Sequence, residues 1–214
     1  AKYTPELIEQ FAGDIEISFP TPTTKDAVDQ IIKNLAQTGP IAAILLGMGV
    51  IASEKQRGTA ALILTKPVTR SAFILSKFLA LIVTLSTGVL LGCAAGYLYT
   101  AILFEPPSAG GYALFTLFIL LSVTVYASLT FLGSTVLRSP LAAGGAGLAA
   151  LAVTAALAAV PGVGDFTPLG LLSPSADLAL ANRQDSVLLP ATVNLVLVGS
   201  AVGLAWLSFR RQSL

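Results

Sequence analysis

The chain has 214 residues, of which 55% are hydrophobic and only 11% are charged, and its mean hydropathy is +0.83. Soluble domains carry about a quarter charged residues, so this sequence has too few charges to cover a soluble core and fits an integral membrane protein. The net charge is +1 and no basic, aromatic-rich surface is present, which argues against a nucleic-acid partner. The sequence has no histidine and a single cysteine, Cys93. These two facts argue against a metal centre, a disulfide framework and His-based catalysis.

Five stretches of the chain are long and apolar enough to cross a membrane. The hydrocarbon core is about 30 Å thick and needs roughly 20 mostly apolar residues in a helix. Helices are the only spanning option for so few segments, because an open sheet would leave backbone groups unpaired in lipid. We therefore predict an all-α, polytopic membrane helical bundle. Its spans are residues 35–53, 71–104, 112–137, 141–160 and 187–209.

Residues 1–34 form an amphipathic segment before the first span. Thr23 or Thr24 can cap a helix that continues through Leu35. We expect this helix to lie on the membrane surface, because its apolar residues recur with helical spacing and its charged residues fall elsewhere. The apolar positions are Val28, Ile31, Ile32 and Leu35.

Basic residues are concentrated in alternate connections between the spans. The connection 54–70 is rich in Lys and Arg, whereas the next connection, 105–111, has none. Cytoplasmic loops carry the excess of Lys and Arg, so we place 54–70 in the cytoplasm. The same alternation makes 138–140 a cytoplasmic turn and 210–214 a cytoplasmic tail, and it puts 1–34, 105–111 and 161–186 outside.

Two outside segments raise further expectations. The loop 161–186 is rich in Pro and Gly yet apolar, so we expect that it can dip back into the bilayer where protein protects its backbone. Residues 1–34 show no signal-peptide pattern, although the predicted orientation requires that they be translocated to the outside. We therefore expect the intact protein to have one more span upstream, which gives six.

The connection EKQRGTAALILTKPVTR, residues 54–70, has the pattern of a short interfacial helix between two spans. The first span should end near Arg57, with Gly58 as the left-handed residue after its C-terminus. Thr59 can cap a new helix, and Pro67 bounds it. The run AALIL is too short to span, so we expect it at the cytoplasmic interface.

Positive-inside charge alone explains the bases of this connection but not a helix, a cap and a proline stop. In addition, Glu54 falls in the last turn of the first span, where an acid meets the negative end of the helix dipole. We expect Lys55 and Arg57 to compensate it, and we expect Glu54 to fix the loop by holding Arg57 or a base on a partner.

The stretch IASEKQRGTAALILTKPVTRSAFILSKFLA resembles the signature of bacterial type-2 (ABC-2 type) ABC transporter permeases. The shared features are an acid-base pair, Arg-Gly-Thr, an apolar run, a Lys-Pro-Val and Arg cluster, and a Lys that enters the next helix. The spacing of spans fits over nearly the whole chain, except that the family's first span is missing. The resemblance implies a permease subunit of an exporter in the bacterial cytoplasmic membrane, paired with a second permease as a homodimer or heterodimer.

The resemblance also implies that the connection forms a coupling helix that sits in a cleft of a separate ABC ATP-binding subunit. This chain has no G-x-x-x-x-G-K-[ST] phosphate loop, so we expect it to bind no cofactor and expect ATP and Mg²⁺ to bind the partner. It should not itself be an enzyme. The residues carried over as coupling residues are Glu54, Arg57, Gly58, Thr59, Leu62, Lys66, Pro67 and Arg70.

Gly88, Gly92 and Gly96 form two consecutive small-xxx-small steps in the second span. Such faces let helices approach closely. Packing within the chain is the ordinary explanation, but two permeases must also meet to form a pathway. We therefore regard these glycines as a candidate helix-packing or dimer face.

Two other function classes have to be weighed. The tetrad Gly-Val-Gly-Asp at 162–165 matches the Gly-x-Gly-Asp of intramembrane aspartyl proteases, in which two aspartates share a proton. No second aspartate lies in a span, and Asp165 follows Pro161 at a helix end, where this tetrad is typical of a turn. An ATP-independent secondary transporter is the other alternative, although no charged residue lies deep in the spans, as ion coupling usually requires.

Overall fold

The computed structural model describes residues 23–59, 69–172 and 188–212. These ranges form an all-α bundle, in which five helices are long and apolar enough to cross a membrane. The fold class predicted from the sequence is confirmed. The elements are α2 (Thr24–Gly47), α3 (Ala52–Gln56), α5 (Arg70–Leu103), α6 (Ala109–Val136), α7 (Pro140–Ala158), the short 3₁₀ turns η1 (Gly164–Phe166) and η2 (Gly170–Leu172), and α9 (Leu188–Arg211).

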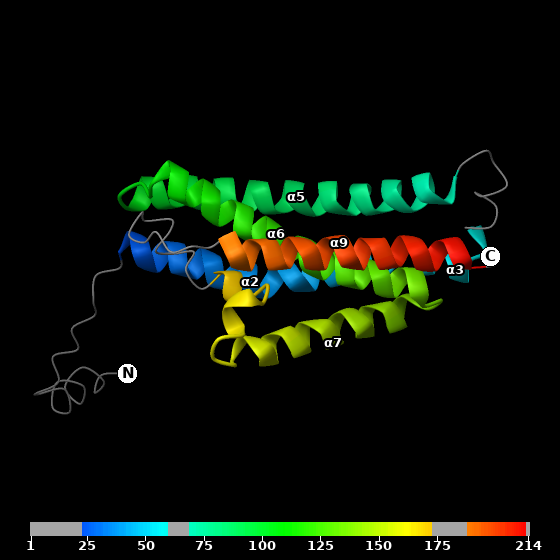
Figure 1. Cartoon of the computed structure of the whole chain (residues 1–214). Helices are drawn as coiled ribbons and strands as arrows, with labels where there is room; N and C mark the ends of the chain where they lie inside the picture. Colours follow the sequence, from blue (N-terminus) through cyan, green and yellow to red (C-terminus); the bar gives the residue numbers. More distant parts are fainter. Residues whose placement is uncertain (1–22, 60–68, 173–187, 213–214) are drawn as a thin grey trace, which may run out of the picture.

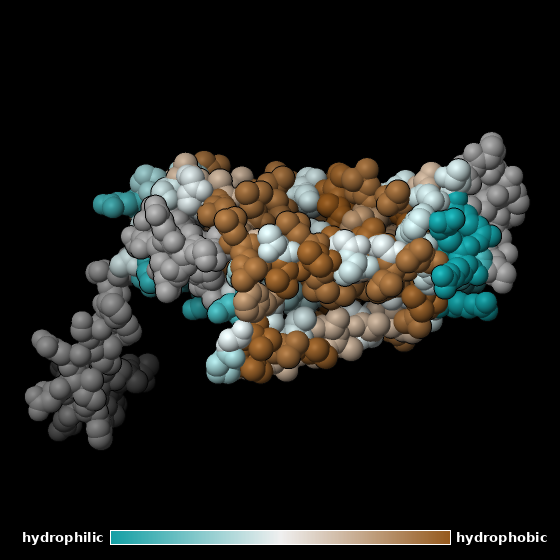
Figure 2. All heavy atoms as spheres, viewed as in Figure 1, coloured by the Kyte–Doolittle hydropathy of each residue, from teal (hydrophilic) through white to brown (hydrophobic). Residues whose placement is uncertain are grey.

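The long helices lie side by side and alternate in direction, with α6 at the centre (Figure 1). Helix α6 contacts α2, α5, α7 and α9. In the most apolar 18-residue stretch of α6, 67% of the residues are buried inside the protein, compared with 17% to 33% in the corresponding stretches of the other spans. Apolar side chains cover the middle of the visible face, and hydrophilic ones gather at one end (Figure 2). A bundle with this surface is suited to lipid as its solvent.

Two buried polar side chains of α6 are bonded to their own helix. The Ser128 hydroxyl donates to the Val125 carbonyl at 2.8 Å, and the Thr135 hydroxyl donates to the Phe131 carbonyl at 2.8 Å. Because a buried hydroxyl without a partner is costly, this self-bonding lets α6 carry these two polar residues at the centre of the bundle.

Small residues bring α7 and α2 close to α6. A Cβ atom placed on Gly147 would lie 2.5 Å from the Thr130 hydroxyl oxygen and 3.1 Å from two Ile44 carbons. One placed on Gly144 would lie 2.9 Å from the Met48 sulfur. Glycine at these two positions therefore sets the distance between the helices, as small residues do in membrane bundles.

The beginning of the bundle differs from the expected boundary between residues 34 and 35. Helix α2 runs without a break from Thr24 to Gly47, and Thr23 caps it in a capping box with Asp26. The amphipathic stripe that suggested a surface helix packs inside the bundle: Val28 is fully buried, and a Cβ on Gly96 of α5 would lie 3.0 Å from Ile31. The apolar face of the first turns of α2 packs against other helices of the same chain, which explains why these turns continue directly into the first span.

The end of the first span also differs from the expectation. Helix α2 ends at Gly47, residues 48–51 form a turn, and the chain then enters the separate helix α3. The ends of the other four spans lie within three residues of those expected from hydropathy.

After α7, the chain turns back through η1 and η2, which contact α6, α7 and α9. Leu171 and Leu172 are buried, and the Asn194 amide of α9 donates to the Phe166 carbonyl at 3.0 Å. The first part of the loop 161–186 is thus packed against protein. Residues 173–186 of that loop, and residues 1–22 of the N-terminal segment, lie outside the described part of the chain.

Candidate functional site

The charged residues of the described chain are divided unequally between the two ends of the bundle. One end, here called the charged end, is where α3, the start of α5, and the ends of α6 and α9 meet (Figures 1 and 2). It holds seven bases and one acid: Lys55, Arg57, Arg70, Lys77, Arg138, Arg210, Arg211 and Glu54. The opposite end holds two bases and four acids: Lys25, Lys33, Asp26, Asp29, Glu105 and Asp165. This asymmetry supports the assignment of the charged end to the cytoplasm.

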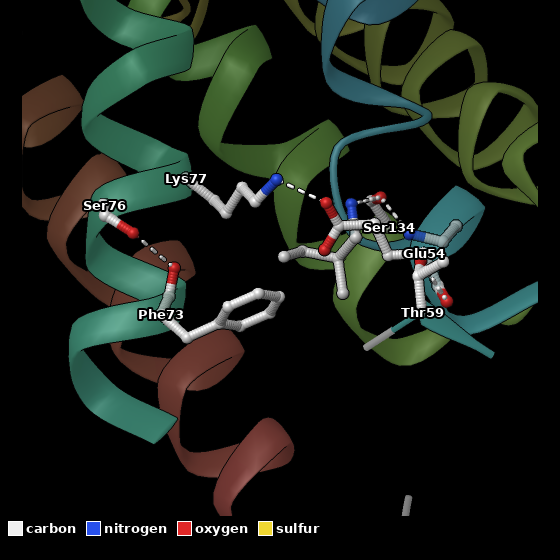
Figure 3. Close-up of polar contacts among 8 residues, drawn as sticks. Glu54, Thr59, Phe73, Ser76, Lys77 and Ser134 are labelled. Carbon is white, nitrogen blue, oxygen red and sulfur yellow. Dashed lines mark hydrogen bonds and ion pairs between the residues drawn. The ribbon is translucent and has the colours of Figure 1, made fainter. Parts of the chain in front are cut away.

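Glu54 forms an ion pair with Lys77. The Lys77 side chain reaches from α5 to α3, and its Nζ donates to Glu54 Oε1 (Figure 3). The two side chains are 20% exposed for Glu54 and 35% exposed for Lys77. Glu54 lies in the first turn of the short helix α3 rather than in the last turn of a long span. The expected conflict with the helix dipole is therefore removed, and the expected partner Arg57 is replaced by Lys77.

Ser134 of α6 holds the turn between α2 and α3. Its Oγ accepts hydrogen bonds from the backbone N–H of Ile51 at 3.1 Å and of Ala52 at 3.0 Å, and it donates to the Met48 carbonyl at 2.9 Å. Ile51, the N-cap residue of α3, has no side chain that can cap. A serine more than 80 residues away in sequence therefore provides the cap.

The last turn of α6 also receives donors from two other elements. Lys55 Nζ donates to the Thr135 carbonyl, and Gln212 Nε2 donates to the same oxygen at 3.0 Å. The carbonyls at a helix C-terminus have no partner within their helix, and a cation there is favourable. These contacts fasten α3 and the end of α9 to α6.

Arg70 fastens the start of α5 to the end of α9. Its Nη1 donates to the carbonyls of Arg210 at 3.1 Å and Gln212 at 2.7 Å. A second link joins the same helices, because the Trp206 indole N–H donates to the Ser71 hydroxyl at 2.9 Å. Both sides of the connection 54–70 are thus anchored in the bundle.

The structure brings together only some of the eight coupling residues expected from the sequence. The Thr59 hydroxyl donates to the Glu54 carbonyl at 3.2 Å, and Gly58 has the expected positive φ of 73°. Arg57 is exposed, and Arg70, at the start of α5, donates to carbonyls at the end of α9. Leu62, Lys66 and Pro67 lie outside the described residues. Sequence reasoning missed Ser134 and the Thr135 carbonyl, for which no local pattern gives a signal.

Comparison with known proteins identifies the family of this chain. Residues 9–205 match the model of a family described as "ABC-2 family transporter protein". The chain belongs to the ABC-2 family. It is thus a multi-pass membrane protein of that family.

A relative of this ABC-2 family chain is known from Bacillus subtilis (strain 168). It is described as "Uncharacterized transmembrane protein YxlG" and is 30% identical over 153 residues, which cover 68% of this chain. The match spans 58% of the relative's length.

The glycine face of the second span in this ABC-2 chain is divided. A Cβ on Gly96 would lie 3.0 Å from both Ile31 and the Tyr112 hydroxyl, so this glycine serves packing within the chain. A Cβ on Gly92 would lie 4.0 Å from Leu35, and one on Gly88 would have nothing within 4 Å among the described residues. Gly88 borders an open groove of about 240 Å³ between α2 and α5. Among the described residues, Gly88 is thus the glycine of this face that no neighbouring helix approaches.

The Gly-Val-Gly-Asp tetrad lies in a turn at the opposite end of the bundle. Gly162 has a φ of 77°, and the Gly164 N–H donates to the Val160 carbonyl at 2.9 Å. Asp165 is exposed on η1. The geometry matches the turn expected from the sequence and gives no support to the protease alternative.

Proposed function

We propose that this chain is the permease subunit of an ABC exporter, driven by a separate ATP-binding subunit that docks at the charged end. The observation that carries the proposal is the way α3 is built. Its inner side is fastened to α5 and α6 through Glu54, Lys55 and the Ser134 hydroxyl, whereas Arg57 and Gly58 at its end are exposed. A segment fixed on one side and exposed on the other can pass a displacement from a partner into the spans.

In this proposal the ATP-binding subunit holds ATP and Mg²⁺, and the connection 54–70 contacts that subunit. Closure of two such subunits on ATP would favour one arrangement of the spans over another, which is a population shift driven by binding energy outside this chain. A second permease, the same chain or a related one, completes the pathway, and the assembly resides in the bacterial cytoplasmic membrane. The export direction rests on family resemblance.

The test is reconstitution with an ATP-binding subunit encoded beside this gene. We expect the two proteins to co-purify and the ATPase activity to depend on the permease. Arg57→Glu should weaken the complex because it reverses an exposed charge at the docking surface. Lys33→Glu, a reversal at the opposite end, serves as the matched control and should leave the complex intact.

Two results would contradict the proposal. Transport by proteoliposomes that contain this chain alone, with unchanged rates on addition of the ATPase and ATP, would indicate a secondary transporter. Equal complex stability in the Arg57 and Lys33 variants would remove the charged end as the docking surface.

A further inference from the structure

We infer that Ser134 is a positioning residue for coupling, whose hydroxyl is inserted into the backbone of the first span and makes a joint between α2 and α3. The joint, defined as residues 48–52, links the coupling connection to α6. This inference rests on the proposed function for its role in transport, but the joint itself can be tested without an ATPase.

The hydrogen bonds at the joint have the geometry of an interrupted helix. In a continuous helix the Ala52 N–H would donate to the Met48 carbonyl, four residues earlier. Here the Ser134 hydroxyl lies between them, accepts from the Ala52 N–H at 3.0 Å and donates to the Met48 carbonyl at 2.9 Å. A side chain that enters the i to i−4 ladder is a known cause of a helix break.

Burial makes this hydroxyl necessary to the broken form. Ile51, Ala52 and Ser134 are all fully buried, so their polar groups have no access to water or headgroups. Among the described residues, Ser134 is the acceptor for the N–H groups of both Ile51 and Ala52. A buried N–H without a partner is rare and costly. If the hydroxyl is removed, the chain can recover one bond by closing the joint into a continuous helix.

The joint is placed where a displacement can reach the whole bundle. On one side of it, Lys55 and Glu54 tie α3 to α6 and α5. Met48, the first residue of the joint, packs against Gly144 of α7. Helix α6, which carries Ser134, contacts the other four long helices of the described chain. A movement of α3 that strains the Ser134 bonds is therefore delivered to the helix that holds the bundle together.

The first experiment measures the joint in the permease alone. Spin labels at Gln56 and Leu141, both exposed near the charged end, would be introduced by cysteine substitution in a Cys93→Ser background, with the protein in nanodiscs. Ser134→Val and Ser134→Thr have the same shape and differ in the hydroxyl. We expect Ser134→Val to shift the label-to-label distance distribution, and Ser134→Thr to retain that of the native serine.

Ser128→Ala is the matched control, because Ser128 is also a fully buried serine of α6 but bonds only to its own helix. It should leave the distance distribution unchanged. If Ser134→Val is not recovered from membranes, Ser134→Ala provides the same test with a smaller side chain. A native distribution in a variant that lacks the hydroxyl would overturn the joint.

The second experiment uses the reconstituted complex with its ATP-binding subunit. We expect the variant that lacks the hydroxyl to co-purify normally but to lose at least about fivefold of the permease-dependent ATPase stimulation, the lower end of typical coupling between sites. Ser134→Thr should restore it. A shifted distance distribution with full stimulation would overturn the positioning role. Failure to find any ATPase dependence in the native complex would contradict the proposed function and leave the first experiment to decide the joint.

Discussion

Replacement of Glu54 by glutamine tests the ion pair at the charged end. The substitution keeps the shape of the side chain and removes the charge that faces Lys77. An exposed pair contributes at most about 1 kcal/mol, and breaking a fully buried pair costs about 3–5 kcal/mol. With side-chain exposures of 20% and 35%, the pair falls between these limits. We expect Glu54→Gln to lower the free energy of unfolding by about 2 kcal/mol.

This expectation differs from the one that the sequence alone supports. If Glu54 lay at the C-terminal end of a long helix, its neutralisation would leave stability unchanged or slightly raised. Because the structure places Glu54 in the first turn of α3 and pairs it with a lysine of another helix, neutralisation should be destabilising. The sign of the change therefore separates the two arrangements.

The assay is reversible unfolding of the purified protein in mixed micelles, with Glu54→Gln, Lys77→Met and the double variant forming a cycle. We expect an interaction free energy of at least about 1 kcal/mol. Arg57→Gln is the control, because this exposed side chain should change stability by less than about 0.5 kcal/mol while still impairing transport. An interaction free energy below about 0.3 kcal/mol in the cycle would refute the pairing.

Three other measurements test the orientation and packing. A cysteine at Ser108 should react with an impermeant thiol reagent added outside intact cells and one at Gln56 should not; the reverse pattern would contradict the topology. Gly147→Ala should lower the unfolding midpoint, because its Cβ would lie 2.5 Å from a threonine hydroxyl of α6. Gly145→Ala faces open space and should leave the midpoint unchanged or raise it. Equal midpoints for the two variants would contradict the close approach of α7 to α6. Asn194→Leu removes a hydrogen-bond donor to η1 and should lower the free energy of unfolding by about 1 kcal/mol. It should also speed the hydrogen exchange of residues 164–172. Unchanged exchange would show that the contact is dispensable.

The parts of the fold that depend on local pattern could be predicted from the sequence. The spans follow from the length of apolar runs, and the cap at Thr23 and the positive φ of Gly58 follow from residue type. The continuous helix α2 could not be predicted as easily. Its amphipathic first turns fit a membrane surface equally well, and contacts with later helices, such as that between Ile31 and Gly96 of α5, decide the matter.

The site was harder to predict than the fold for the same physical reason. The charges of the connection 54–70 were visible, but which base would face Glu54 depends on how α3 lies against α5. The joint at residues 48–52 could not be predicted from the sequence, because it depends on the hydroxyl of Ser134, which is 83 residues beyond Ile51 and 82 beyond Ala52. Long-range hydrogen bonds leave no periodic trace in the sequence near either partner.

The anchoring of α5 by the end of α9 has a practical consequence for anyone who handles this protein. The carbonyls of Arg210 and Gln212 are acceptors for Arg70, and the Gln212 amide bonds to α6. Removal of residues 210–214 would therefore remove both acceptors of Arg70, the first residue of α5, at the exit of the coupling connection. A fusion tag joined directly after Gln212 would place its linker at the same point. Affinity tags are better placed elsewhere when the measured property is communication with an ATPase.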